Sequence, residues 1–106
     1  MTKYVLLFSG GSMPEPGPET DKMMKSWEGW FTKLGKAVVD QGDPFTPKAK
    51  SIGSDGSVTD GAVGAAASGY AILEADSLDA AVKMAKGCPQ LKSGGQITVY
   101  ETFNVM

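Results

Sequence analysis

The sequence predicts a single α+β domain, residues 1–106, in which two helices pack on one face of a sheet. Two kinds of pattern support this prediction. In some segments apolar residues recur at every third or fourth position, as in helices, and these segments alternate with short runs rich in β-forming residues. In chain order, the patterns predict strand, helix, strand pair, strand, helix, strand. The chain of 106 residues is long enough for one core, and it has no solenoid repeat or low-complexity tail.

The segment 68–91 gives the clearest signal, because a pattern of period two changes there into a helical pattern. Both sets of alternating side chains in 70–75 are largely apolar, which is typical of a strand covered on both faces. Ser77 can cap the first turn of a helix, and Gly87 can cap its end. The apolar stripe of this helix consists of Leu78, Ala81, Val82 and Ala85.

Two further strands are predicted at the ends of the chain. The run 3–9 is almost continuously apolar and stops at Gly10, so it resembles a buried strand. Residues 96–103 are rich in β-branched and aromatic types and alternate as a strand does. Three prolines in 12–20 predict a connecting loop of extended character, with a proline-rich ligand segment as the alternative.

The middle of the chain predicts one long helix and an irregular strand pair. Large apolar residues recur at helical spacing from about 19 to 41, and Gly42 is the expected end. We expect 43–52 to be an irregular edge strand, 54–56 a tight turn, and 57–59 a short return strand. The apolar residues of the helix are Met23, Trp27, Trp30, Phe31, Leu34 and Val38.

This order of elements predicts a ferredoxin-like βαββαβ sandwich. Two helices can cover one face of such a sheet, yet the strands around Leu6 and Ile72 are apolar on both faces. We therefore expect a homodimer in which two sheets pack face to face and form a dimeric α/β barrel.

The composition argues against several classes of partner and site. The net charge of -2 provides no basic stripe, so nucleic acid is not an expected partner. The chain has no histidine, and its one cysteine is Cys88, so we predict no metal site, no cofactor and no histidine-based triad. It has no apolar run long enough for a transmembrane helix and no signal-peptide pattern, so we expect a cytoplasmic protein without membrane contact.

Three segments of the chain are similar to one known family. They are KYVLLFSGG at 3–11, SGYAILEADSLDAAVKMAKGCPQL at 68–91 and GGQITVYET at 94–102. With the tryptophan-bearing helix, they resemble the DGPF-type members of the YCII-related family over nearly the whole chain. The resemblance implies a dimeric α/β barrel. It also implies relatives that are largely without assigned activity, of which a few look like lyases or isomerases of ring-derived metabolites.

The chain departs from the family pattern at two places. The Asp-Gly-Pro-Phe motif and its charged continuation are reduced to Asp60 and Gly61, which Ala62 follows. Gln90 stands where many relatives carry histidine, and an amide cannot take over an acid-base role.

The candidate catalytic residues are two carboxylates. Asp60 could act as a general base or orient a substrate hydroxyl, although a turn former ahead of Gly61 is the structural alternative. Glu74 lies on the strand side of Tyr70, so in a dimer interior it would be a carboxylate near aromatic walls. Solvent exposure at the end of the strand is the alternative for Glu74.

The candidate ligand-binding residues are Trp27, Trp30, Tyr70, Gln90 and Tyr100. Each has a structural alternative: core packing for the tryptophans, strand packing for the tyrosines, and capping of the turn at 87–91 for Gln90. Cys88 follows a helix C-terminus, where the dipole does not favour a thiolate, so we interpret it as a small buried residue.

Three functions remain open from the sequence. The first is a homodimer that binds a small organic metabolite between sheet and helices, near Asp60, Trp27, Tyr70 and Gln90. The second is a lyase or isomerase of a cyclic metabolite, in which Asp60 or Glu74 moves a proton and a tyrosine steadies negative charge. The third is a structural or interaction module without a pocket.

Overall fold

The structure is a computed structural model that describes residues 2–10, 18–46, 48–62, 64, 66–92 and 94–103. It is a mixed α+β fold with an antiparallel sheet and helices, as the sequence predicts. Most of the predicted proline loop 12–20 lies outside the described residues, as do parts of the predicted loop 60–68.

A four-stranded sheet with the order β2-β5-β1-β6 forms the centre of the fold. β1 (Thr2–Gly10) is flanked by β5 (Ala67–Ala75) and β6 (Gly95–Glu101), and all three pair in antiparallel fashion. β2 (Val38–Asp40) pairs with the outer side of β5. The three strands predicted at 3–9, 70–75 and 96–103 are therefore confirmed.

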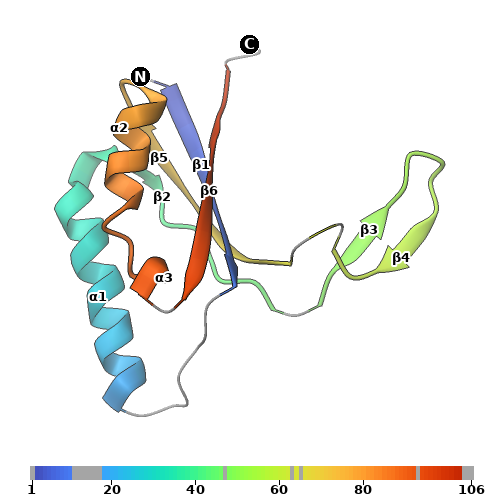
Figure 1. The fold of residues 1–106 in the computed structure, drawn as a ribbon, viewed down its shortest axis with the longest axis horizontal. Coiled ribbons are helices and arrows are strands. Elements are labelled where there is room, and N and C mark those ends of the chain that lie inside the picture. Colours follow the sequence, from blue (N-terminus) through green and yellow to red (C-terminus); the bar gives the residue numbers. More distant parts are fainter. Residues whose placement is uncertain are drawn as a thin grey trace.

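The helices lie together on one side of this sheet (Figure 1). They are α1 (Pro18–Leu34), α2 (Leu78–Ala85) and the short α3 (Pro89–Lys92). Ser77 caps α2 as predicted, because its Oγ accepts a hydrogen bond of 3.1 Å from the Ala80 N–H. The core between helices and sheet contains Leu6, Phe8, Trp30, Ala71, Leu73, Ala85 and Cys88.

The predicted helix 19–41 is too long at its C-terminus. α1 ends at Leu34, a 3-10 turn covers Gly35–Ala37, and β2 begins at Val38. Gly35 has a φ of 56°, in the left-handed region that glycine adopts readily, so it ends the helix. Val38 pairs with Leu73 of β5 and packs on the core. A tertiary pairing thus overrides the helical spacing of Val38.

The predicted irregular strand 43–52 is also largely wrong. Pro44 forms one isolated bridge with Gly69, and regular strand structure is confined to β3 (Lys50–Ile52). β3 pairs with β4 (Val58–Asp60) through the predicted turn, so the hairpin itself is confirmed. In that turn Gly56 has a φ of 88°.

The side chain of Asp55 stabilises the hairpin turn. Its Oδ1 accepts hydrogen bonds from the Ser57 N–H at 2.9 Å and from the Ser57 hydroxyl at 2.7 Å. These bonds favour the ionised form, so they lower the pKa of Asp55 below its ordinary value. The turn is thus fixed by its own side chains.

The hairpin stands away from the main sheet as a separate two-stranded sheet (Figure 1). We call residues 50–60 the arm. Figure 1 shows the helices on one side of the main sheet and the arm extending from the other. The sheet face turned away from the helices is called the open face. Its side chains include Val5, Leu7, Tyr70, Ile72, Glu74, Thr98 and Tyr100.

Gly42 is held in a position that no other residue fits. Its φ is 68°, and a Cβ built on it would overlap the carbonyl oxygen of Tyr70. We expect Gly42→Ala to lower the free energy of unfolding by about 3 kcal/mol or more, measured by urea denaturation.

Gly35→Ala is the matched control, because Gly35 has a φ of 56° but nothing within 4 Å of a built Cβ. It should cost only the backbone strain of about 1 to 2 kcal/mol. Equal costs for the two variants would show that the close approach to Tyr70 is unimportant.

Candidate functional site

The open face is an apolar surface that carries a few polar groups. Strand register places Val5 between Ile72 and Tyr100, and Leu7 between Tyr70 and Thr98. Val5, Leu7, Tyr70 and Ile72 are half-buried, and Tyr100 is 52% exposed. Among the described residues no element packs over these side chains, so the two-sided character predicted for the central strands leaves apolar surface in water.

Tyr70 lies at the centre of an aromatic contact that extends the open face toward the arm. The ring of Phe45 stacks on it with a centroid distance of 5.8 Å and an interplanar angle of 26°. The Phe45 N–H donates to the Ser68 carbonyl at 2.8 Å, which fixes this connecting segment against β5. Phe45 is 45% exposed, so the apolar surface continues beyond the sheet. The sequence had no pattern that singled out Phe45.

Glu74 lies on the open face with Tyr70 and Ile72, as the alternation predicts. It stands opposite Lys3 in the register of β1 and β5, close to the end of the sheet. Its side chain is half-buried, and a second copy packed on the open face would remove more of it from water. On the described open face, the carboxylate of Glu74 thus lies on the same strand, β5, as the hydroxyl-bearing Tyr70.

The two tryptophans belong to the helix side. Trp30 is buried, and its Nε1 donates to the Met84 carbonyl at 3.0 Å, which ties α1 to α2. Trp27 packs edge-on against Phe8, with ring centroids 5.4 Å apart. Phe31 completes this aromatic group. The placement favours core packing over the walls of a ligand pocket.

Gln90 braces the end of the sheet. It is buried, and its Nε2 donates to the carbonyls of Ser9 and Gly10, each at 3.2 Å. The same amide lies against Gly95, where a Cβ would overlap it. Gln90 therefore joins α3 to the last residues of β1 and the first residue of β6. These bonds reach distant strands, whereas the sequence suggested a cap on the turn at 87–91.

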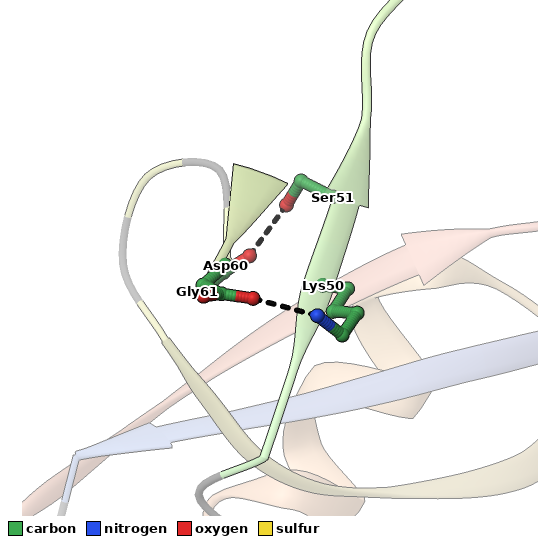
Figure 2. Close-up of polar contacts among 4 residues, drawn as sticks. All are labelled: Lys50, Ser51, Asp60 and Gly61. Carbon is green, nitrogen blue, oxygen red and sulfur yellow. Dashed lines mark hydrogen bonds and ion pairs between the residues drawn. The ribbon is translucent and has the colours of Figure 1, made fainter. Parts of the chain in front are cut away.

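Asp60 lies on the arm, far from the helix layer (Figure 1). Its Oδ1 accepts from Lys50 Nζ at 2.7 Å, and its side chain is 88% exposed. Figure 2 shows this ion pair beside the hydrogen bond of 2.7 Å that the Ser51 hydroxyl donates to the Gly61 carbonyl. Both contacts close the base of the hairpin. An exposed ion pair of this kind stabilises it by little more than about 1 kcal/mol.

The predicted site residues are therefore distributed over three places within one protomer. Trp27, Trp30 and Gln90 lie in the helix layer or beneath it, and Asp60 lies on the arm. Tyr70, Glu74 and Tyr100 share the open face. The structure does not bring Asp60, Trp27, Tyr70 and Gln90 around one pocket. Glu74, Tyr70 and Tyr100 are the members that lie on one surface.

A cleft that sequence reasoning missed lies between α2, α3 and β6. Its volume is about 360 Å³. It is mainly apolar, and Lys86 contributes a charged side chain. The lining residues are Leu78, Val82, Ala85, Lys86, Leu91, Ile97, Thr98 and Val99. None of the predicted ligand-binding residues is among them. The cleft lies where α2 and α3 pack against β6.

Two buried reactive groups lie on the helix side. Burial raises the pKa of the Cys88 thiol to about 11. Burial likewise raises the pKa of Tyr4, whose hydroxyl donates to Glu101 Oε1 at 3.3 Å. Both groups are protonated at neutral pH. This agrees with the interpretation of Cys88 as a small buried residue.

The described part of the chain offers neither a cluster of metal ligands nor a helix that could span a membrane. Within it, no three histidine, cysteine or acidic residues come together as a group that could hold a metal ion. Its helices all fall short of the length and apolar character that crossing a membrane requires.

The raised pKa of Cys88 predicts a loss of stability at alkaline pH. In the unfolded chain the thiol has a pKa of about 8.5, whereas in the folded chain its pKa is about 11. Because the unfolded state loses this proton first, the stabilising effect is present below about 8.5 and declines as the pH rises toward 11. Urea denaturation of wild type and Cys88→Ala across this range measures it. The difference between the two free energies of unfolding should shrink with pH, and parallel profiles would contradict the expectation.

Comparison with known proteins adds no family to this geometry. No protein-family model matches the chain, and no curated protein matches it. The resemblance of 3–11, 68–91 and 94–102 to the YCII-related family is therefore an expectation from those residues. The function has to be inferred from the open face, the arm and the cleft.

Proposed function

We propose that two copies of this chain pack open face against open face and bind a small organic metabolite between the two sheets. The observation that carries the proposal is an apolar sheet face that also presents Glu74, Tyr70 and Tyr100, on β5 and β6, the two strands that flank β1. A two-fold dimer needs a single self-complementary patch, and this face supplies one.

The topology supports the finer fold assignment that belongs to this proposal. Each half of the main sheet is built from a strand, a helix and a second strand: β1, α1 and β2, then β5, α2 and β6. The order β2-β5-β1-β6 interleaves the two halves. This order supports our proposal of a ferredoxin-like sandwich, with the arm inserted in the chain between β2 and β5. Two such sheets packed face to face would form a dimeric α/β barrel.

The chemistry of the open face supports a ligand of mixed character. Small-molecule sites are mostly apolar, with a few polar groups that fix orientation. Val5, Leu7 and Ile72 would contact the rings or aliphatic parts of a ligand. The hydroxyls of Tyr70 and Tyr100 can donate to a carbonyl or carboxylate, and Glu74 can accept from a hydroxyl or amine. A cyclic metabolite with one or two oxygen substituents fits this set.

One observation favours a second candidate function, a lyase or isomerase. Glu74 and Tyr70 lie on the same face of one strand. Enclosed between two sheets, Glu74 would lie beside a bound ligand, where a carboxylate can act as a general base. A tyrosine hydroxyl could then stabilise the negative charge that develops on a carbonyl oxygen. Asp60 is less suited to this role because it is exposed and paired with Lys50.

The dimer is tested by changing one residue at the centre of the open face. In sedimentation equilibrium we expect wild type to be dimeric at micromolar concentration. Ile72→Asp should raise the dissociation constant by roughly 100-fold or more, because two charges would be buried without partners. Met24→Asp is the control, since Met24 is 60% exposed on α1. A wild type that sediments as a stable monomer would contradict the proposal.

The ligand is tested by thermal shift with a panel of cyclic carboxylates and ketones. A binder should raise the Tm of wild type, and the rise should fall for Tyr70→Phe, which loses a hydroxyl of the open face. Tyr4→Phe is the matched control, because Tyr4 lies on the helix side. Equal shifts for the two variants would exclude the open face.

Catalysis is tested on any compound that binds. Glu74→Gln should keep the thermal shift but lose turnover if Glu74 moves a proton, since an amide cannot exchange one. Asp60→Asn provides the comparison on the arm and should leave turnover unchanged. Turnover that survives in Glu74→Gln would leave binding as the function.

A further inference from the structure

The arm exposes two apolar side chains that its own protomer leaves uncovered. Ile52 and Val58 stand directly opposite each other in β3 and β4, so they share one face of the hairpin. They are 73% and 58% exposed. A two-stranded hairpin with an uncovered apolar face is marginally stable by itself in water. A surface that covers these two side chains would therefore stabilise the arm.

The arm is nevertheless built to keep one shape. At its tip, the Asp55 carboxylate accepts two hydrogen bonds from Ser57, and the Gly53 N–H donates to the Ser57 carbonyl at 2.7 Å. At its base, Lys50 pairs with Asp60, and the Gly61 N–H donates to the Ala49 carbonyl at 2.8 Å. A preformed element loses little conformational entropy when it docks, so such an arm is suited to binding a protein surface.

The direction of the arm identifies the surface. It leaves the body on the open-face side, opposite the helices (Figure 1). Its connecting segment is tied to β5 through the Pro44–Gly69 bridge and the Phe45–Tyr70 stack. The apolar surface is thus continuous from Tyr70 through Phe45 toward the arm. Anything that packs on the open face must lie beside the arm.

The size of the open face is the second observation that points to a role for the arm in the dimer. β1 and β5 have nine residues each, β6 has seven and β2 has three, so at about 3.3 Å per residue and about 4.8 Å between strands the sheet face covers roughly 450 Å². A stable specific interface buries about 800 Å² on each partner. The sheet faces alone fall short of this, so a dimer needs further contact area. Packed sheets lie about 10 Å apart. The arm doubles back at its turn, so it reaches about half its extended length, roughly 17 Å, which is enough to pass alongside a second sheet.

We propose that the arm clasps a second copy of this chain, with Ile52 and Val58 packed on the body of that copy. The inference rests on the proposed face-to-face dimer and adds the element that completes its interface. By two-fold symmetry each copy embraces the other, and the two arms lie on opposite sides of the paired sheets. The clasp also limits access to the space between the sheets, where Tyr70 and Glu74 lie.

The test compares the two faces of the arm in sedimentation equilibrium. The double variant Ile52→Asp with Val58→Asp should raise the dimer dissociation constant by roughly tenfold or more, because it removes two apolar contacts and introduces charge. The matched control is Thr59→Asp, compared with Val58→Asp alone. It places the same charge on the opposite face of the same strand and leaves the hydrogen bond from Ser51 to Gly61 intact. It should leave the dissociation constant within about threefold of wild type.

A photo-crosslinking benzophenone side chain at position 58 supplies the second measurement. Irradiation of the dimer should give a covalent dimer, and peptide mapping should join the arm of one copy to the body of the other. Wild type that dimerises, with unchanged affinity in the double Asp variant and no covalent dimer, would overturn the clasp and leave the face-to-face dimer standing. Wild type that stays monomeric would overturn both.

Discussion

The two central strands carry apolar side chains on both of their faces, and the helices of the described chain cover one. On the covered face, Leu6 of β1 and Leu73 of β5 are fully buried beneath Trp30. On the other face, Val5, Leu7 and Ile72 are half-buried and meet water. Apolar surface in water is unfavourable by about 25 cal/mol per Å², so this imbalance is the constraint on which the rest of the structure depends.

The helix side is fixed by contacts that leave little freedom for another role. Trp30 joins α1 to α2 through a hydrogen bond to the Met84 carbonyl, and Gln90 joins α3 to the end of β1 through Ser9 and Gly10. Cys88 is buried in the same layer, and its raised pKa keeps it a neutral thiol. These residues hold the scaffold together. The groups capable of recognition are consequently found on the open face and on the arm.

The arm and the open face share one physical problem, which is apolar surface without a cover. Tyr70 and Phe45 link the two through a stacked pair that continues the surface of the sheet toward the hairpin. A second copy of the chain would cover both at once. It would also convert Glu74, Tyr70 and Tyr100 from residues on an exposed sheet into residues that line an enclosed space, where hydrogen bonds and charges are stronger than in water.

The sequence by itself determined the elements whose patterns are local. A continuous apolar run defined β1, and alternation defined β5 and β6. Ser77 marked the start of α2 because a capping hydroxyl needs no distant partner. Alternation also placed Glu74 and Tyr70 on one face. The end of α1 was misplaced, because Val38 continues the helical spacing although Gly35 ends the helix and Leu73 recruits Val38 into the sheet.

The tertiary structure decided what depends on distant contacts. Asp60, Trp27, Tyr70 and Gln90 looked like one site because a sequence gives residue types without their positions in space. Folding separates them. Helix packing places Trp27, partly buried, and Gln90, buried, on one side of the sheet, the pleat turns Tyr70 to the other, and the hairpin carries Asp60 away. The sequence therefore determined which strands are apolar on both faces, and the topology decided which face the helices leave open.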